Sequence, residues 1–454
     1  MKQRTLVQVG DLMGAQLLEG EDRTPVCGAS IDSRTVEAGQ LFFALPGSNT
    51  HGVHFARQAM SRGASAVVVS PQQADQVSGP RLSVEQPAEA LAQLAARVRE
   101  EEQWQLPAAA VTGSVGKTTT CGFVAQLLTT LAPTQYPKGS YNNYLGVPLT
   151  ILNAAPPCRY LICEVGSNAP GEVLTLARWV FPRVACVTAI GPAHLKGFGS
   201  LGAIENEKLS ILDAIEDGDE GWIPVEFAER CRGRKWVFTF GPGGDLEVRQ
   251  RADREWTLKL AREGRELPFA WRPPLPHSKS NLEAALAVGI ALGAPPEGLL
   301  AQVDRLVLPP LRGEVQEHGG VDLLLDCYNS NPASLESAIT RLETEPASGR
   351  KVCVMGSMEE LGQDEEQWHR RLGGRLAALD QVYLVGRCRE WVRAGLREMG
   401  SDGELLSVDD LSAQRLADSL RPGDRVLFKA SRREALEGLA HRVAQLLNQK
   451  SEAR

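Results

Sequence analysis

The sequence has no excess of positive charge, no long hydrophobic run and no paired cysteine motif. Its 49 Lys and Arg residues against 56 Asp and Glu give a net charge of −7, which argues against nucleic acid as a partner. The longest apolar stretch, residues 284–296, is too short to cross a bilayer, and the first 14 residues lack the apolar core of a secretory signal. The nine cysteines include no Cys-x-x-Cys pair, which favours reduced thiols over a zinc site or a disulfide framework. These absences predict a cytoplasmic protein without a membrane span.

The sequence has the length of a multidomain protein and the alternating strand and helix patterns of an α/β fold. At roughly 150 residues per domain, 454 residues predict three domains. Short β-branched runs alternate with helical patterns, which indicates units of a parallel sheet. We expect strands at 66–69, 108–112, 160–164, 184–188, 323–326, 351–355, 381–385 and 425–429, and helices at 117–131, 282–292, 334–343 and 365–379.

Two changes in composition predict the domain boundaries. The first lies near residues 79–106, where a polar turn and a charged helix at 97–103 precede a strand. The second is the Pro-Pro segment at 306–314, which should be extended and stiff. We therefore expect domains at 1–105, 106–311 and 312–454. Residues 241–270 alternate polar and apolar side chains and predict a small antiparallel insertion.

The segment AAAVTGSVGKTTT, residues 108–120, has the order of strand, glycine-rich turn and helix start that a phosphate-binding loop requires. The backbone N–H groups of the turn would converge on phosphate oxygens, Lys117 would reach the outer phosphates, and Thr118 would offer its hydroxyl to magnesium. The residues expected to bind ATP here are Gly113, Ser114, Val115, Gly116, Lys117, Thr118 and Thr119. The spacing departs from the usual motif because position 111 is Val, and the alternative is a surface glycine turn before Lys-Thr.

A phosphate-binding loop alone does not distinguish a GTPase, a kinase, a transport ATPase and a ligase. No Asp-x-x-Gly follows the loop and no Asn-Lys-x-Asp occurs in the chain, so a GTPase switch lacks its expected partners. Other segments have to decide the class.

Five further segments narrow the choice. They are IDSRTVEAGQLFFALPGSNTHGVHF (31–55), YNNYLGVPLTIL (141–152), EVGSN (164–168), AHLKGFGSLGAIENEKLSIL (193–212) and DCYNSNPASLESAI (326–339). With the phosphate loop, they make the chain resemble the Mur ligase family, the ATP-dependent amide-forming ligases of peptidoglycan synthesis. The last segment resembles the members that join D-alanyl-D-alanine to a UDP-N-acetylmuramoyl tripeptide, and the Asp-Asn-Pro-Arg motif of the sibling that adds a diamino acid is absent. The chain departs from the family at Ser357, where Asp is common, and at HSKSN (277–281), which lacks an inner Asn. LRGE (311–314) matches the Arg-containing segment of the family only loosely.

The resemblance implies a fold and a reaction. The fold would combine a UDP-sugar-binding N-terminal α/β domain, a central P-loop domain with a parallel sheet, and a Rossmann-like C-terminal domain that binds the incoming dipeptide. ATP would phosphorylate the terminal carboxylate of the tripeptide, and the amine of D-alanyl-D-alanine would attack the resulting acyl phosphate. The expected cofactors are ATP and two Mg²⁺ ions, and a monomer is expected. The third residue of the tripeptide, lysine or diaminopimelate, stays open.

The resemblance also implies the catalytic residues Lys117, Glu164, His194 and Lys208, and the metal ligands Thr118, Glu164, His194 and Lys208 as a carbamate. Glu164 ends an apolar strand, where its carboxylate should be exposed at the sheet edge beside the phosphate loop. The alternative for Glu164 is a pair with Lys or Arg. For His194 the alternative is an ordinary surface or core histidine, and for Lys208, beside Glu205 and Glu207, it is a solvated helix face.

The remaining candidates follow from the same resemblance. Asn281 would recognise adenine with His277 nearby, or cap the following helix, while Arg312 would reach the phosphates and Asp326 the ribose hydroxyls. Asn142 and Asn143 would contact substrate and phosphate, and Tyr328, Asn329 and Asn331 would line the cleft; all five also fit turns and helix caps. Ser33, Arg34, Ser48 and the region of His51 would hold the uridine diphosphate, or form a polar turn. His369, Ser431 and Arg432 are weaker candidates for the dipeptide side, or solvated residues.

Two other functions fit parts of the chain. A different Mur-type or a folylpolyglutamate-type ligase would share the phosphate loop and the lysine segment, but would lack the first domain and DCYNSNP. A nucleotide-binding regulatory protein would keep the fold without turnover, and the intact Lys117, Glu164, His194 and Lys208 argue against it.

Overall fold

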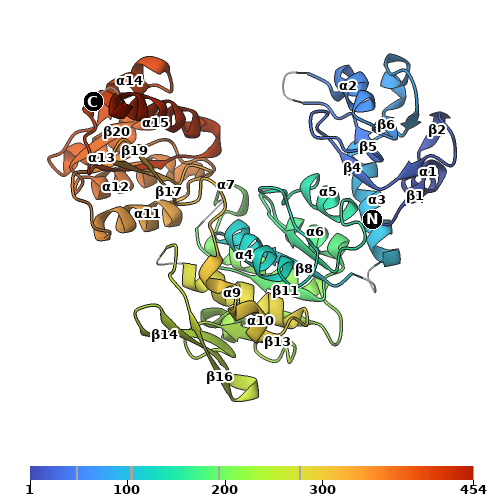
Figure 1. Cartoon of the computed structure of the whole chain (residues 1–454), viewed down its shortest axis with the longest axis horizontal. Helices are drawn as coiled ribbons and strands as arrows, with labels where there is room; N and C mark the ends of the chain where they lie inside the picture. Colours follow the sequence, from blue (N-terminus) through green and yellow to red (C-terminus); the bar gives the residue numbers. More distant parts are fainter. Residues whose placement is uncertain (48–49, 103–105, 193–194, 276–277, 453–454) are drawn as a thin grey trace.

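The computed structural model describes residues 1–47, 50–102, 106–192, 195–275 and 278–452. These residues fold around three large β-sheets, of five, nine and six strands, that follow one another along the chain (Figure 1). The expected three-domain α/β architecture is thereby confirmed. Among the helices of the described part, none is long and apolar enough to cross a membrane.

The first sheet has five strands in the order β2-β7-β6-β5-β4, of which only β2 is antiparallel to its neighbour. Its strands are β2 Gln16–Glu19, β4 Gly28–Ser30, β5 Gln40–Phe43, β6 Ala66–Val69 and β7 Arg81–Ser83, and a separate pair is formed by β1 Arg4–Thr5 and β3 Pro25–Val26. The helices are α1 Leu6–Met13, α2 Ala56–Ser61 and α3 Pro87–Glu102.

Helix α3 joins this sheet to the next one. It packs against α1 on the N-terminal side and against α5 and α6 of the central domain. It begins at Pro87, ten residues before the charged helix expected at 97–103, because Ala90, Leu91 and Leu94 supply a buried face that the charged end of the helix does not reveal. One apolar core therefore runs from Met1 in the first domain to Ile223 in the central sheet without interruption.

The central sheet has nine strands in the order β16-β15-β14-β13-β12-β11-β8-β10-β9. Its strands are β8 Ala108–Thr112, β9 Thr134–Gln135, β10 Tyr160–Glu164, β11 Val184–Val187, β12 Glu220–Pro224, β13 Val237–Phe240, β14 Leu246–Ala252, β15 Glu255–Leu260 and β16 Arg265–Ala270. The pairs β14–β15 and β15–β16 are antiparallel. The expected antiparallel insertion is confirmed, and it extends the edge of the parallel sheet.

Helices cover both faces of the central sheet. They are α4 Lys117–Thr129, α5 Gly146–Leu152, α6 Glu172–Val180, α7 Leu195–Phe198, α8 Leu201–Leu209, α9 Ser278–Ala291 and α10 Pro296–Leu300. Helices α5 and α6 pack into the core shared with the first domain, whereas α4 and α9 pack on each other in a second core. The phosphate loop lies between β8 and α4, in the middle of the sheet.

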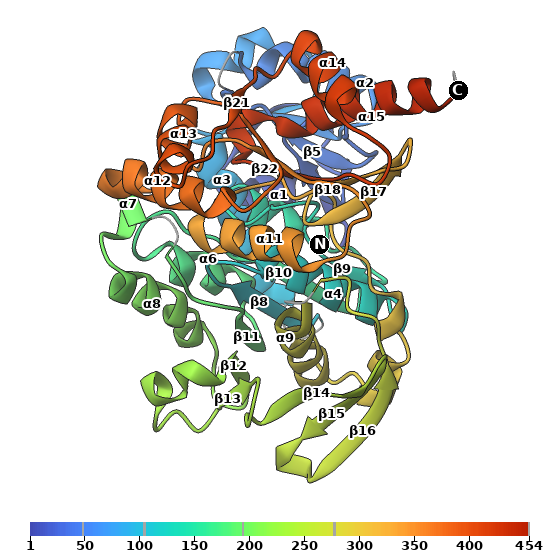
Figure 2. The same ribbon diagram turned by 90° about the vertical axis from the view of Figure 1, so that its left-hand side faces the viewer.

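The C-terminal sheet has six strands in the order β17-β18-β22-β19-β20-β21, all parallel except β17. Its strands are β17 Glu314–His318, β18 Val321–Leu325, β19 Lys351–Met355, β20 Gln381–Leu384, β21 Glu404–Leu405 and β22 Arg425–Lys429. The helices are α11 Pro332–Thr344, α12 Glu365–Leu376, α13 Arg389–Glu398, α14 Asp410–Ser419 and α15 Leu436–Glu452. They enclose two cores of their own, one on each face of the sheet. In Figure 2, α11 is the helix of this domain that lies over the central sheet.

Candidate active site

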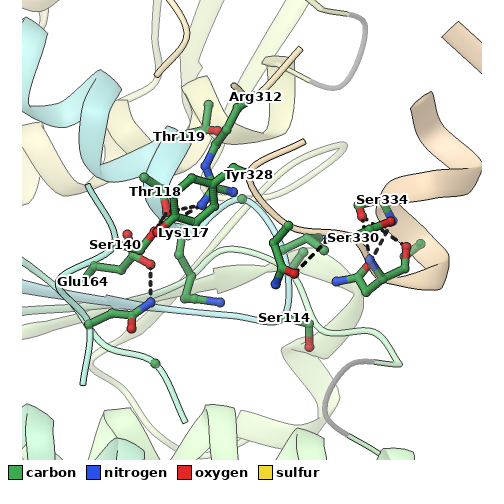
Figure 3. Close-up of a pocket in the computed structure, with 18 of the residues that line it drawn as sticks. Ser114, Lys117, Thr118, Thr119, Ser140, Glu164, Arg312, Tyr328, Ser330 and Ser334 are labelled. Carbon is green, nitrogen blue, oxygen red and sulfur yellow. Dashed lines mark hydrogen bonds between the residues drawn. The ribbon is translucent and has the colours of Figure 1, made fainter. Parts of the chain in front are cut away.

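A cavity of about 750 Å³ opens between the central and the C-terminal domains (Figure 3). The central domain contributes the phosphate loop, the segment 140–145 and the loop after β10. The C-terminal domain contributes the loop after β18 and one face of α11. The cavity thus brings together segments that are more than 200 residues apart in the sequence.

The phosphate loop is held in place by the segment that follows β11. The backbone N–H of Ser114 donates to the Ala189 carbonyl at 2.7 Å, and the Ser114 hydroxyl donates to the Gly191 carbonyl at 2.9 Å. Gly113 has φ +149°, and a Cβ at this position would lie 2.2 Å from the Thr188 hydroxyl oxygen. The loop therefore keeps its conformation although Val111, inside β8, replaces the first glycine of the usual motif.

Two cationic side chains meet at this loop. The Lys117 ammonium donates to the Gly113 carbonyl at 2.7 Å. Burial lowers the pKa of Lys117, and the negative charge of Glu164 opposes that shift. Arg312 reaches across from the interdomain segment, and its Nη2 donates to the Thr118 hydroxyl at 2.9 Å and to the Ser140 hydroxyl at 3.2 Å. Both cations lie where the phosphates of a nucleotide are expected.

Glu164 ends β10 beside the strand that leads into the phosphate loop, with Val111 as its register partner. The sequence-based expectation of an exposed carboxylate is wrong, since the residue is only 1% exposed. Its Oε1 accepts from the Asn142 amide at 2.7 Å, and its buried Oε2 has no hydrogen-bond partner (Figure 3). The expected alternative, an ion pair with Lys or Arg, is not formed by Glu164 among the residues that the structure describes, although the Lys117 charge acts on it from a distance. A buried, unpartnered carboxylate oxygen that lines the same cavity as Thr118 fits a hard divalent cation such as Mg²⁺.

Lys208 lies in the last turn of α8 and is 1% exposed. Its ammonium donates to the Ser167 hydroxyl at 2.7 Å. Glu207 is buried as well, and its carboxylate accepts from the N–H groups of Gly171 at 2.6 Å and Val173 at 2.8 Å. The solvated helix face that the neighbouring glutamates suggested is therefore wrong, because the start of α6 covers this end of α8. Burial, and to a lesser extent the charge of Lys117, lowers the pKa of Lys208 to about 7.

The asparagine candidates of the central domain have different partners. Asn142 orients Glu164, whereas the Asn143 side chain accepts from the N–H groups of Leu145 at 3.1 Å and Gly146 at 3.0 Å. This is the expected turn geometry ahead of α5, whose N-cap residue is Leu145 and not Asn143. Asn281 accepts from the Thr120 hydroxyl at 3.2 Å. Asn281 lies inside α9, which begins at Ser278, so the expected alternative of a helix cap is wrong.

On the C-terminal side, Asp326 directly follows β18 and pairs with the Lys429 ammonium at 2.9 Å. The Tyr328 ring lies 4.4 Å from the guanidinium carbon of Arg312 and 5.6 Å from that of Arg432. Asn329 accepts from the N–H of the next residue at 2.9 Å, and Asn331 caps α11. These two asparagines have the expected turn and cap geometry, and they line the cavity at the same time.

The other candidates lie outside the residues that line this cavity. In the first domain, the Ser33 hydroxyl donates to Gln58 at 2.7 Å, Arg34 pairs with Asp32 at 2.7 Å, and His51 accepts from a backbone N–H. Ser48, His194 and His277 lie outside the described residues.

The candidates for the dipeptide side differ in burial. His369 is fully buried, not solvated: its Nε2 accepts from the Met358 N–H at 2.9 Å and its Nδ1 lies 2.7 Å from the Glu365 carbonyl. Ser431 is 2% exposed and its hydroxyl has no hydrogen-bond partner. Only Arg432, which pairs with Glu437 at 2.6 Å, has an exposed side chain.

Sequence reasoning missed Ser140, Ser167 and Lys429, all of which line the cavity. Ser140 and Ser167 carry no signal of their own, because a serine in a polar loop is common. Lys429 could have been found, since it ends an apolar strand in the same way as Glu164, and a charge at that position marks the functional edge of a parallel sheet.

Comparison with known proteins agrees with this geometry. The Mur ligase middle domain profile matches residues 111–269, the Mur ligase glutamate ligase domain matches 312–432, and the Mur ligase family catalytic domain matches 25–99. The UDP-N-acetylmuramoyl-tripeptide--D-alanyl-D-alanine ligase of Escherichia coli is 31% identical over 95% of this chain and 96% of its own length.

Solved structures agree as well. A crystal structure of MurF from Acinetobacter baumannii has a TM-score of 0.82 and 27% identity, over 98% of this chain and 99% of that chain. The MurF ligase of Thermotoga maritima in complex with ADP has a TM-score of 0.75 and 26% identity, over 93% of this chain and 98% of that one. The chain therefore belongs to the Mur ligase family.

Proposed function

We propose that this chain is an ATP-dependent ligase that joins the terminal carboxylate of a UDP-N-acetylmuramoyl-tripeptide to the amine of D-alanyl-D-alanine. The products are the amide, ADP and phosphate, and the reaction serves peptidoglycan precursor synthesis in the cytoplasm. The names of its relatives support the two substrates. The observation that carries the proposal is the cavity itself, in which a phosphate loop, two cations and the loop of the DCYNSNP segment face one another.

The reaction has two transfers. A carboxylate oxygen of the tripeptide attacks the γ-phosphorus of ATP, and ADP leaves. The amine of the dipeptide then attacks the acyl carbon, loses a proton, and phosphate departs. Both steps develop negative charge on phosphate oxygens, and cations fixed beforehand in the site stabilise it. Lys117 and Arg312 supply such cations, and the backbone N–H groups of residues 113–118 hold the phosphates at the start of α4.

Glu164 and Thr118 are the side chains that would hold Mg²⁺, together with His194. When bound, the ion neutralises the phosphate oxygens and so lowers the barrier to their transfer. Asn142 fixes the Glu164 carboxylate by one oxygen, which leaves the other for the ion. This arrangement needs few protein ligands because Mg²⁺ keeps several waters.

The proposal includes a second Mg²⁺ and a carbamate on Lys208. An ammonium at this position would repel a cation. Loss of one proton gives the neutral amine, and addition of CO₂ to that amine with loss of a second proton gives the carbamate, so the charge changes from +1 to −1 in total. The lowered pKa of about 7 supports this step, because a substantial share of the amine is then neutral near pH 7. Carbon-13 bicarbonate NMR tests it: a carbamate signal should be present in the unsubstituted protein and absent after Lys208→Arg.

We assign the parts of the substrates to the proposed domains 1–105, 106–311 and 312–454. Ser33, Arg34 and Ser48 of the first would hold the UDP group, and Asn142 and Asn143 the peptide end. Asn281 and Asp326 would bind the adenosine, and Tyr328, Asn329 and Asn331 the reacting groups. The enzyme would act as a monomer.

Phosphate release tests the proposal. The assay uses ATP, Mg²⁺ and matched UDP-muramoyl peptides, with and without D-alanyl-D-alanine. We expect release only when tripeptide and dipeptide are both present, with lysine and diaminopimelate tripeptides compared side by side. Release with a folate and glutamate instead would favour the other ligase class, and no release with any substrate would favour a regulatory protein.

A further inference from the structure

Lys429 is a buried lysine in the wall of the active-site cavity that the proposed reaction does not use. It is the last residue of β22, and its side chain is 2% exposed. Its ammonium lies 2.9 Å from Oδ2 of Asp326 and donates to the Asn329 carbonyl at 2.9 Å. One cation thus binds both ends of the four-residue segment 326–329, which carries Tyr328.

The two oxygens of the Asp326 carboxylate differ in their contacts because Lys429 pairs with only one of them. Oδ2 faces the ammonium, while among the described residues no donor approaches Oδ1. The Asp326 side chain is 24% exposed and lines the cavity. The ammonium therefore determines which oxygen of Asp326 points to a ligand, and it fixes the carboxylate before a ligand arrives.

A second ion pair joins the same two strands at their other end. Arg425 begins β22 and pairs with Asp322 of β18 at 2.7 Å. Each of these residues lies four positions before the corresponding member of the first pair, Lys429 or Asp326. Arg425 also pairs with Glu345, at the C-terminal end of α11, at 2.9 Å. None of these three residues lines the cavity, so their ion pairs hold β22 to β18 and to α11 without touching a ligand there. Buried ion pairs contribute little net stability compared with apolar side chains, so sheet stability alone does not explain the pair at the cavity end.

We propose that Lys429 is a positioning residue for nucleotide recognition: by holding Oδ2 of Asp326 and the Asn329 carbonyl, it presents Oδ1 of Asp326 to a ribose hydroxyl. This inference rests on the proposed function only for the identity of the nucleotide. Without Lys429, Asp326 would lose its fixed orientation, and the hydroxyl would lose a charged acceptor.

Calorimetric titration of ADP, 2′-deoxy-ADP and 3′-deoxy-ADP tests this on the full-length protein, and does not require ligase activity. A hydrogen bond to a charged acceptor is worth roughly tenfold or more in affinity. The unsubstituted protein should therefore bind ADP at least about tenfold more tightly than one of the two deoxynucleotides. In Lys429→Met this ratio should fall to about twofold, because the affinity for ADP drops and that for the deoxynucleotide does not.

Arg425→Met is the matched control. It removes the ion pairs of Arg425 with Asp322 and Glu345, which both lie outside the cavity lining, so it should leave the ADP ratio unchanged even if it lowers the melting temperature. Should Lys429→Met fail to fold, Lys429→Gln is titrated instead and the same criteria apply.

The inference is overturned if the Lys429 variant keeps the full ratio, if Arg425→Met loses it equally, or if the unsubstituted protein does not distinguish ADP from either deoxynucleotide. Failure of the ligase proposal would look different: ADP would bind with the expected ratio, but no phosphate would be released from ATP with the two substrates.

Discussion

Replacing Glu164 with Gln should lower the rate and raise the stability at the same time. The carboxylate is 1% exposed and its Oε2 has no partner. An unsatisfied buried oxygen of this kind costs about 1–3 kcal/mol, and its attraction to Lys117 offsets part of that cost. Gln keeps the size and can still accept from Asn142 through its carbonyl. We therefore expect the free energy of unfolding without ligands to rise by about 1 kcal/mol.

The rate should change in the opposite direction, because the amide offers no anionic oxygen to Mg²⁺. Loss of one charge-stabilising group typically costs 10²–10³-fold in kcat, or about 3–4 kcal/mol. Phosphate release over a range of Mg²⁺ concentrations and denaturant unfolding without Mg²⁺ measure the two effects. The control is Glu283→Gln, a 3% exposed glutamate on α9 outside the cavity, which should keep its rate. A Glu164→Gln protein that is markedly destabilised, or that keeps its rate within about tenfold, would refute the reasoning.

Three further outcomes are expected. Lys117→Met should reduce phosphate release by at least about 10²-fold while circular dichroism stays unchanged, because within the described part of the chain the ammonium hydrogen-bonds only to its own loop. Lys208→Ala should lose most activity and recover part of it with added acetate; full activity without acetate would contradict its role. His369→Gln should flatten the pH dependence of unfolding below about pH 6.5: burial lowers the pKa of His369, so the unfolded chain binds more protons there and the unsubstituted protein loses stability as pH falls. Equal slopes in denaturant titrations at several pH values would contradict this.

The local part of the site could be predicted from the sequence. The strand at 108–112 and the helix start at Lys117 have the observed bounds, because a continuous run of small and apolar residues followed by a glycine turn is a property of adjacent residues. The strands at 160–164, 351–355 and 425–429 also match, and those at 184, 323 and 381 differ at their ends by one or two residues. Buried strands of a parallel sheet are apolar throughout, which makes them easy to recognise.

The contacts that make the site could not be predicted in this way. Arg312 and Thr118 are 194 residues apart, and Lys429 and Asn329 are 100 apart. These residues come together only when the domains and strands pack in the folded chain. No pattern of neighbouring residues in the sequence predicts that packing. The burial of Glu164 and Lys208 was missed for the same reason: the residues that cover them come from other segments.

The core that passes through α3 has a consequence for how the protein unfolds. Since the first and the central domains share one set of apolar contacts, neither can lose its packing without exposing the other. The C-terminal domain has separate cores and is joined through the segment 306–314. Calorimetry should therefore record two cooperative transitions for three sheets, and a protease that cuts near residue 311 should release the C-terminal domain as a folded fragment while the remainder stays intact.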